Sequence, residues 1–377
     1  MTRTLLLKPE FDTDQDATCS QWLAAALRDP RALRQFKRRG LLGLGEAYMD
    51  GLWEADQLDE LMYRLFTIAP QRLSAVNRGR MLATALWSRL VDQQAGRGAF
   101  RIGRAHYDLG NDLFSVMLDR SLTYTSGYWA SAKTLDEAQE AKLELLCQKL
   151  DLQPGMRVLD IGCGWGNFAA HAAAHHGVHV TGITVSGEQA AMATERCDGL
   201  PVDIQVQDYR HLSGTYDRIV SIEMIEAVGR RNIPKFMGVV DRSLAADGLF
   251  AMQVISGDML SRTSDRRMDQ FILFLLKYIF PDGYLPHPRE LSDVRGTGLR
   301  VEDWHVFSGD YDRTLMAWSD RFNGGWESLA GRYDERFKRR WNYYLHGCAA
   351  AFRAGHIDVQ QIVYSKGACN SRYQPIR

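Results

Sequence analysis

Two carboxylates stand in an apolar setting at residues 221–229, which read SIEMIEAVG. Glu223 and Glu226 have Ile, Met, Ala and Val as neighbours, just where an apolar run ends. A carboxylate that is buried without a partner is unstable as an anion, so its pKa rises until it takes up a proton. Such an acid could take a proton from a substrate or stabilise a developing positive charge. The alternative is a carboxylate at a helix start, where the helix dipole favours it.

A glycine-rich turn lies upstream, in VLDIGCGWGNF (residues 158–168). Gly162, Gly164 and Gly166 let the backbone turn sharply and approach a ligand closely, which predicts a nucleotide-like cofactor. Their spacing is GxGxG, whereas dinucleotide sites use GxGxxG, and the next expected strand is followed by no acid until Glu188. Asp160 is suited to face the cationic amino-acid end of a cofactor. These residues favour S-adenosylmethionine over a dinucleotide.

The elements that must position these residues form an alternating pattern. Strand-like segments are MRVLDIG, HVTGIT, VDIQVQD, YDRIVSIE and GLFAMQVI, and the helical segments NFAAHAAAHH, GEQAAMATERC and IPKFMGVVDRSL lie among them. Strands that alternate with helices of this length form a parallel sheet covered on both faces. The sequence therefore predicts an α/β domain with its chemistry at strand ends.

The first part of the chain has a different pattern. Residues 20–90 are predicted to be helical, with a turn-rich break at residues 39–56. Residues 91–103 are polar and rich in glycine, which fits a linker. We therefore expect a small helical domain at residues 1–95 and the α/β domain at residues 96–377.

A basic run lies in the helical domain. One acid, Asp29, is surrounded by Arg28, Arg31, Arg34, Lys37, Arg38 and Arg39. Such a run could lie on anionic lipid headgroups, and a solvated helix face would look the same. The longest apolar segment, residues 271–280 (FILFLLKYIF), is about half as long as a bilayer requires and contains Lys277. The protein is expected to touch a membrane without spanning it.

The overall composition excludes some classes of function. With 46 basic and 46 acidic residues there is no global attraction to nucleic acid. The 6 cysteines lack CxxC spacing and the N-terminus lacks a signal-peptide pattern, so we expect a cytoplasmic protein. Histidines cluster at positions 171, 175, 176 and 179, but no cysteine or carboxylate joins them at ligand spacing, so no metal site is predicted.

Several longer motifs resemble the cyclopropane-fatty-acyl-phospholipid synthases. They are GLGEAYMDGLWEAD (43–56), HYDLGNDLF (106–114), LTYTSGYW (122–129), AQEAKLELLCQKLDLQPGMRVLDIGCGWG (138–166), VQDYR (206–210), VEDWHVFSGDYDRTLMAW (301–318) and YYLHGCAAAFRAG (343–355). The resemblance covers nearly the whole chain. It implies a Rossmann-like class I methyltransferase fold, with a seven-stranded, mostly parallel sheet, a helical lid and an N-terminal lipid-facing domain.

The resemblance also implies a reaction. The family transfers the methyl group of S-adenosylmethionine to a cis double bond of an unsaturated phospholipid acyl chain, and proton loss then closes a cyclopropane ring. It implies a protein bound peripherally at the inner membrane face, and a homodimer in many cases. The apolar segment at residues 271–280, with Tyr284 and Leu285, could line the dry slot that this chemistry needs, or be a plain core helix.

Site residues follow from the resemblance by motif. For the methionine end of the cofactor they are Gly162, Gly164, Gly166, Tyr124 and Thr125, in addition to Asp160. For the ribose they are Thr184, Val185 and Gln189, and for the adenine Asp208 and Tyr209.

The resemblance implies that the base is a bound bicarbonate ion. Its cage would be formed by Glu226, Tyr311, Gln253 and the backbone at Ile255 and Ser126, with Glu302 supporting Gln253. Glu223 is left out of this set.

The sequence departs from the commoner family pattern at three positions. Ala227 and Gln253 stand where histidines are usual, and Ser126 stands where a cysteine is usual. Serine and an amide still form hydrogen bonds but do not titrate near neutral pH as histidine does. Three alternatives therefore stay open: a methylene- or methyl-branched product, a non-catalytic lipid- or cofactor-binding relative, and a methyltransferase of a small soluble molecule.

Overall fold

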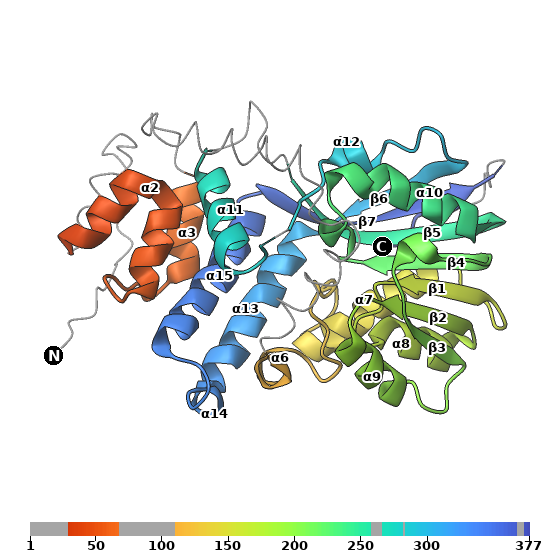
Figure 1. Ribbon diagram of the computed structural model, residues 1–377, viewed down its shortest axis with the longest axis horizontal. Helices are drawn as coiled ribbons and strands as arrows, with labels where there is room; N and C mark the ends of the chain where they lie inside the picture. The colour runs from red at the N-terminus through yellow and green to blue at the C-terminus, as the bar shows by residue number, and fades with distance from the viewer. Residues whose placement is uncertain (1–28, 68–109, 258–265, 282, 368–372) are drawn as a thin grey trace. The chain divides into compact units, whose positions relative to one another are not determined.

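The computed structural model describes residues 29–67, 110–257, 266–281, 283–367 and 373–377 (Figure 1). Arg28, the linker at residues 91–103 and the boundary expected near residue 95 lie outside the described residues, so the domain division stays a prediction. The chain divides into two compact units, a helical one and one built on a sheet. The helical unit takes residues from three separate parts of the chain: 1–87, 259–281 and 315–356.

The larger unit contains a seven-stranded sheet with the strand order β3-β2-β1-β4-β5-β7-β6. Its strands are β1 (Arg157–Ile161), β2 (His179–Thr184), β3 (Val202–Val206), β4 (Tyr216–Ile222), β5 (Leu244–Gly257), β6 (Leu299–Val306) and β7 (Ile357–Lys366). The first five strands pair in parallel, and β7 pairs antiparallel with both β5 and β6. The predicted class I methyltransferase sheet is confirmed, and the order reverses beside β1, where α/β sheets bind ligands.

Helices complete this unit. They are α6 (Asn111–Met117), α7 (Leu135–Lys149), α8 (Asn167–His176), α9 (Gly187–Arg196), α10 (Ile233–Ser243), α12 (Pro288–Leu291) and the first residues of α13 (Ser308–Gly324), with short 3-10 turns η2 (Tyr209–His211), η3 (Ile225–Ala227) and η4 (Arg230–Asn232). The three helices expected between the first five strands coincide with α8, α9 and α10 within one residue.

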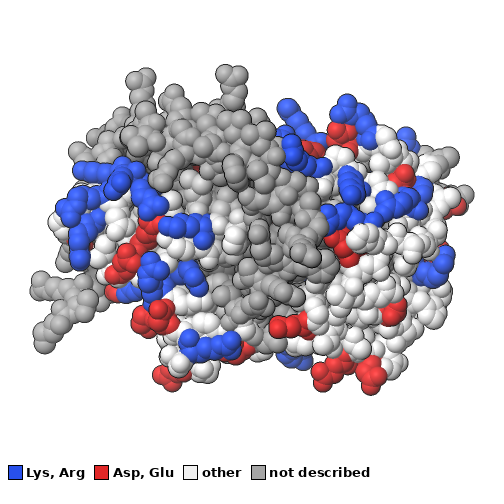
Figure 2. Space-filling view, viewed as in Figure 1, with Lys and Arg blue, Asp and Glu red and all other residues white. Residues whose placement is uncertain are grey.

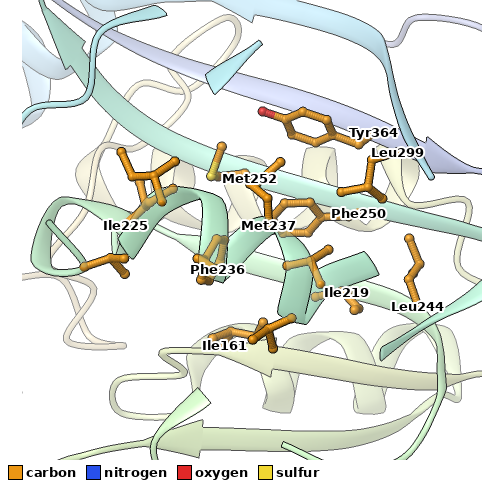
Figure 3. Close-up of a cluster of buried hydrophobic side chains, with 14 of the residues drawn as sticks. Ile161, Ile219, Ile225, Phe236, Met237, Leu244, Phe250, Met252, Leu299 and Tyr364 are labelled. Atoms are coloured by element: carbon orange, nitrogen blue, oxygen red, sulfur yellow. The ribbon is translucent and has the colours of Figure 1, made fainter. Parts of the chain in front are cut away.

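The two faces of the sheet carry separate hydrophobic cores. Along β5, Phe250 and Met252 belong to one core, whereas Leu249 and Ala251 belong to the other, because successive residues of a strand point to opposite faces. Figure 3 shows the first core, in which Phe236 and Met237 of α10 face the β5 side chains. The second core is covered by α7 and α8. Both faces are thus buried, and the chemistry is confined to the strand ends.

The smaller unit is a helical bundle. Its described helices are α2 (Pro30–Met49), α3 (Leu58–Thr67), α11 (Arg266–Tyr278), α14 (Trp326–Leu329), α15 (Glu335–Arg353) and the part of α13 from residue 315. None of the helices in the described part of the chain is long and apolar enough to cross a membrane.

The break expected at residues 39–56 is partly wrong. The helix α2 continues to Met49 with only a kink at Gly40, where φ is 57° and ψ is −138°. Gly45 serves close packing instead of a turn, because a Cβ built on it would lie 2.6 Å from the ring of Tyr343. Gly51, with a φ of 70° and open space around it, does lie in a turn, after the end of α2. Packing against α15 therefore overrides the local turn signal.

The apolar segment at residues 271–280 is a core helix in its first part. Phe271 and Phe274 are fully buried, and their ring centroids lie 6.0 and 4.7 Å from that of Tyr343 in α15. The plain alternative is therefore correct for these two phenylalanines.

Candidate active site

A cavity of about 230 Å³ lies at the carboxyl ends of β1, β2 and β4. Its walls come from the turn after β1, the segment before α7, the end of β2, the turn η2 and the residues after β4. Ten of the residues predicted to hold the cofactor line it: Tyr124, Thr125, Asp160, Gly162, Gly164, Thr184, Val185, Gln189, Asp208 and Tyr209. The sheet topology thus gathers residues that are up to 85 positions apart (124 to 209).

The glycine turn adopts a backbone that side chains disfavour. Gly162, Gly164 and Gly166 have φ values of 84°, 54° and 79°, in the left-handed region open to glycine. A Cβ on Gly162 would lie 2.5 Å from the side chain of Met224, whereas one on Gly164 would meet nothing within 4 Å. Gly162 and Gly164 line the cavity, and Gly166 caps the start of α8. The turn leaves open space for a ligand at Gly164.

Asp160 offers a buried acceptor to that ligand. Its side chain is 2% exposed, and Oδ2 accepts no hydrogen bond from any described residue. Burial raises the pKa of Asp160 to about 7, against the charge of Lys142. An orphaned carboxylate oxygen in the wall of a cavity fits the cationic amino group of S-adenosylmethionine, which would restore its missing partner.

The far end of the cavity carries polar groups held by neighbours. Thr184 Oγ1 donates to Gln189 Oε1 at 2.9 Å, and Arg210 Nε donates to Asp208 Oδ1 at 2.9 Å. Thr184, Gln189 and Asp208 are each under 9% exposed. These acceptors suit the hydroxyl and amino groups of a nucleoside.

Glu223 lies at the centre of a hydrogen-bond cluster. Its Oε1 accepts from Ser126 N–H at 2.9 Å and from Gln253 Nε2 at 2.8 Å, and its Oε2 accepts from Tyr311 O–H at 2.7 Å. Burial raises the pKa of Glu223, while these hydrogen bonds and the charge of Lys142 act to lower it. The three groups predicted to surround bicarbonate therefore surround a side chain of the protein.

Glu226, the predicted catalytic acid, has fewer partners. Its Oε1 accepts from Ile255 N–H at 2.6 Å, and within the described residues its buried Oε2 has no partner. Burial and the charge of Glu223 raise the pKa of Glu226 to about 8. Both side chains are half-buried, and the charge of each disfavours the charge of the other. The three donors favour the charged form of Glu223, so the proton of the pair is assigned to Glu226.

The support of Gln253 differs from the prediction. Gln361 Nε2 donates to Gln253 Oε1 at 3.0 Å, and Glu302 Oε1 accepts from Ser365 Oγ at 2.5 Å. The reason is the sheet: Gln253 on β5 faces Gln361 on β7, while Glu302 lies at an irregularity in the pairing of β6 with β7. Gln361 thus takes the supporting position that we expected for Glu302.

Sequence reasoning missed two residues of the site. Glu223 lies in the motif SIEMIEAVG (residues 221–229), and its apolar neighbours were a signal that it is shielded from solvent. Lys142 is fully buried, its Nζ donates to Thr125 Oγ1 at 2.8 Å, and burial lowers its pKa to about 8. Lys142 lies between Glu140 and Glu144, a pattern that is typical of a solvated helix face. The local sequence therefore gave no reason to predict that Lys142 is buried.

The histidine cluster has neighbours that the sequence did not reveal. Glu144 Oε2 lies 3.3 Å from His171 Nε2 and 3.0 Å from His176 Nε2, and the ligand atoms of Cys147, His171 and His176 lie within 4.8 Å of one another. The statement that no cysteine or carboxylate joins these histidines is wrong. Burial, with the charge of Glu144, raises the pKa of Cys147 well above its usual range, which disfavours the thiolate that a metal needs.

The chain is similar to several known proteins. Residues 95–362 match the family described as mycolic acid cyclopropane synthetase. The chain is 45% identical over 344 residues to the cyclopropane-fatty-acyl-phospholipid synthase of Escherichia coli K12, covering 91% of this chain and 88% of that protein. It is 34% identical to the tuberculostearic acid methyltransferase UfaA1 of Mycobacterium tuberculosis, covering 91% and 85%.

Solved structures are similar as well. The cyclopropane synthase MmaA2 of Mycobacterium tuberculosis superimposes with a TM-score of 0.67 at 32% identity, covering 71% of this chain and 98% of that one. The mycolic acid cyclopropane synthase CmaA1, solved with S-adenosylhomocysteine, gives the same values. Coclaurine N-methyltransferase, at 19% identity and a TM-score of 0.65, shares the fold.

Proposed function

This chain belongs to the mycolic acid cyclopropane synthetase family, and from that premise we propose that it converts unsaturated phospholipid acyl chains into cyclopropane fatty acids. It is an S-adenosylmethionine-dependent methyltransferase of the cyclopropane-fatty-acyl-phospholipid synthase type. The methyl group goes to the cis double bond, and one proton is then lost as the ring closes.

The observation that carries the proposal is that two acids with different surroundings, Asp160 and Glu223, line the same cavity. Asp160 offers a free carboxylate oxygen beside the glycine turn, where the cationic cofactor fits. Glu223 lines the same cavity, with Glu226 three residues further along the chain. An alkene attack on an electrophilic methyl group leaves a positive charge on carbon, and a fixed anion in low dielectric stabilises that charge.

The residues of the chain have separate tasks. When bound, S-adenosylmethionine supplies an electrophilic methyl group. Asp160, Thr184 and Asp208 would hold its two ends by their acceptor atoms. Met224 lines the cavity next to Gly162, where only a glycine leaves room for its side chain. Glu223 is half-buried and the Oε2 atom of Glu226 is fully buried, which limits the access of water that would capture the cation.

The groups predicted for bicarbonate do not fit that ion in this structure. Ser126 N–H, Gln253 Nε2 and Tyr311 O–H already donate to Glu223, and Ile255 N–H donates to Glu226. A second anion would have to displace a buried carboxylate from its donors. No step of the proposed reaction is therefore assigned to bicarbonate.

We also propose that the helical unit meets the lipid surface through α2. Arg31, Arg34, Lys37 and Arg38 are exposed along this helix, and Figure 2 shows blue side chains gathered where α2 lies. Their spacing by three and four places them on one side of the helix. A basic face of this kind attracts anionic headgroups. The cytoplasmic location at the inner membrane face and the homodimer remain predictions.

The experiment that tests the function uses the purified protein, S-adenosylmethionine and vesicles of a dioleoyl phospholipid. The acyl chains are expected to gain the mass of one methylene group, with S-adenosylhomocysteine formed in equal amount. Vesicles of a saturated phospholipid are the matched control and should stay unchanged. Unchanged oleoyl chains would reject the proposal.

A further inference from the structure

We propose that the carboxylate of Glu223 is the catalytic base of this enzyme, performing with a side chain of the protein the task that the resemblance assigns to bicarbonate. The inference rests on the proposed function, because it names the group that takes the proton in that reaction. It concerns a residue that the motif comparison left out of the catalytic set.

The first argument is the set of donors around Glu223. Its two oxygens accept three hydrogen bonds, from Ser126 N–H, Gln253 Nε2 and Tyr311 O–H, at 2.7 to 2.9 Å. Burial, together with the charge of Glu223, raises the pKa of Tyr311 well above its usual range, so this hydroxyl stays a donor. Three donors that converge on one half-buried carboxylate are the arrangement that holds an anion. Here the anion is covalently part of the chain.

The second argument is the orientation of Gln253. An amide can present either its oxygen or its NH₂ to a neighbour, so the direction must be fixed by a further contact. Gln361 Nε2 donates to Gln253 Oε1 at 3.0 Å, which leaves the NH₂ of Gln253 to donate toward Glu223 at 2.8 Å. Gln361 and Gln253 are both 0% exposed. The chain Gln361–Gln253–Glu223 therefore points its donors at an anion.

The third argument is backbone strain at Glu223. Its φ is 47°, in the left-handed region, where a residue other than glycine is uncommon. The conformation is imposed by the sheet, because Glu223 N–H donates to Gln253 C=O at 2.8 Å where β4 ends beside β5. Strain of this kind is retained at functional sites when the side chain is needed there. A glycine would be relaxed at this position, and the chain has an acid instead.

The neighbouring acid supports the assignment. Glu226 accepts one hydrogen bond, from Ile255 N–H, and its Oε2 is buried without a partner in the described part of the chain. Lys142 is the buried cation whose charge acts on Glu223. The positive charge of Lys142 and the three hydrogen bonds favour the ionised form of Glu223. Of the two acids, Glu223 is therefore the one suited to act as the base.

The step balances with this base. The π electrons of the alkene form the bond to the methyl carbon, and the bond from that carbon to sulfur breaks with its electrons left on sulfur. The other alkene carbon is then positive. A proton leaves the added methyl group for a carboxylate oxygen of Glu223, and the electron pair of that C–H bond closes the ring. Glu223 releases the proton to solvent before the next turnover.

The test compares the enzyme with and without bicarbonate, using dioleoyl phospholipid vesicles in buffer stripped of carbon dioxide. Turnover of the unmodified enzyme is expected to be the same in both conditions. Glu223→Gln is expected to lose about a hundredfold or more in turnover, since general bases contribute about that much. Its affinity for S-adenosylhomocysteine, measured by calorimetry, is expected to change less than about twofold. Glu195→Gln, an exposed site on α9, is the matched control.

Glu223→Gly adds a test that does not depend on lost activity. This variant relieves the positive φ and vacates the donors, so it is expected to fold, to bind ¹³C-labelled bicarbonate detectably by NMR and to regain turnover when bicarbonate or formate is added. The inference is overturned if the unmodified enzyme requires bicarbonate, if Glu223→Gln turns over normally, or if no small anion restores Glu223→Gly. An unmodified enzyme without product on any unsaturated lipid would instead reject the proposed function.

Discussion

At the scale of single residues, the site depends on three acids whose surroundings differ. Asp160 is buried, has a carboxylate oxygen without a partner among the described residues and has a pKa raised to about 7. The half-buried Glu226 has a pKa raised to about 8, and the half-buried Glu223 accepts hydrogen bonds from three donors. The same functional group can therefore bind a cation, stay protonated or act as a base, according to its partners.

Asp160→Asn is expected to weaken the binding of S-adenosylhomocysteine by about tenfold, which corresponds to ~1.4 kcal/mol. The ionised form of Asp160 binds the ammonium group, so affinity in the unmodified enzyme should rise as the pH increases through about 7, and the variant should lack this rise. Calorimetry between about pH 6 and pH 8 measures both effects. The matched control is Asp198→Asn, an exposed position; equal affinities in the two variants would contradict the role of Asp160.

Glu226→Gln is expected to stabilise the protein at alkaline pH. The folded pKa of Glu226 is raised to about 8 from 4.5, so folding loses stability as the pH rises between these values and the unfolded chain ionises. Glutamine keeps the neutral form at every pH. The free energy of unfolding in urea should therefore rise by about 1 kcal/mol or more near pH 8, and by much less near pH 5. A variant that is destabilised equally at both pH values would show that Glu226 is ionised in the folded protein.

At the residue level, the sequence predicted the local turn: Gly162 adopts the left-handed backbone that the glycine motif predicted, and Gly162 and Asp160 line the same cavity. Their roles in cofactor binding stay predictions. It failed for Glu223 because the partners of this acid come from residues 126, 253 and 311, which only the fold brings together. It failed for Glu302 because an irregularity in the pairing of β6 with β7 decides where its side chain lies.

At the scale of elements, periodicity was sufficient for the sheet unit and insufficient for the helical one. The strands β1 to β5 and the helices between them were predicted from alternation alone, since each must bury apolar residues on a set period. In α2 the glycines suggested turns, but Gly40 and Gly45 are places where neighbouring helices approach closely: Gly40 lies against Gln270 of α11, and Gly45 against Phe274 of α11 and Tyr343 of α15. A local pattern does not distinguish these two uses of glycine.

Gly347 provides a test of that close approach. A Cβ at this position of α15 would lie 2.4 Å from the ring of Phe271 in α11, and Phe271 is fully buried and cannot move away. Gly347→Ala is therefore expected to lower the free energy of unfolding by about 1–3 kcal/mol, despite the higher helix propensity of alanine. Urea unfolding measures the change, with Gly324→Ala in α13 as the control, because a Cβ there would meet nothing within 4 Å. Equal effects of the two substitutions would contradict the packing of α11 against α15.

At the scale of the whole molecule, the chain is electrically neutral, so attraction to lipid has to be local. The total of 46 basic and 46 acidic residues leaves the exposed face of α2 as the local charge that we assign to the membrane. Replacing Arg34, Lys37 and Arg38 together by glutamine should weaken binding to anionic vesicles by roughly a hundredfold, since each charge contributes about 1 kcal/mol. Binding to zwitterionic vesicles should change little, and added salt should reduce the difference.

Sedimentation with vesicles measures this binding. The matched control replaces three exposed cations of the sheet unit, Lys235, Arg295 and Arg300, by glutamine. If both sets of substitutions weaken binding equally, the attraction is a property of total charge and α2 has no special part in it.

The central claim, methyl transfer to an alkene followed by ring closure, is tested most directly by proton NMR of the lipid product, formed from S-adenosylmethionine with a natural or a fully deuterated methyl group. Ring methylene protons far upfield are predicted with the natural cofactor, and with the deuterated one the product should retain two of the three deuteriums, since the base removes one. Downfield protons of an exocyclic alkene, or a saturated branch with all three deuteriums, would contradict the claim.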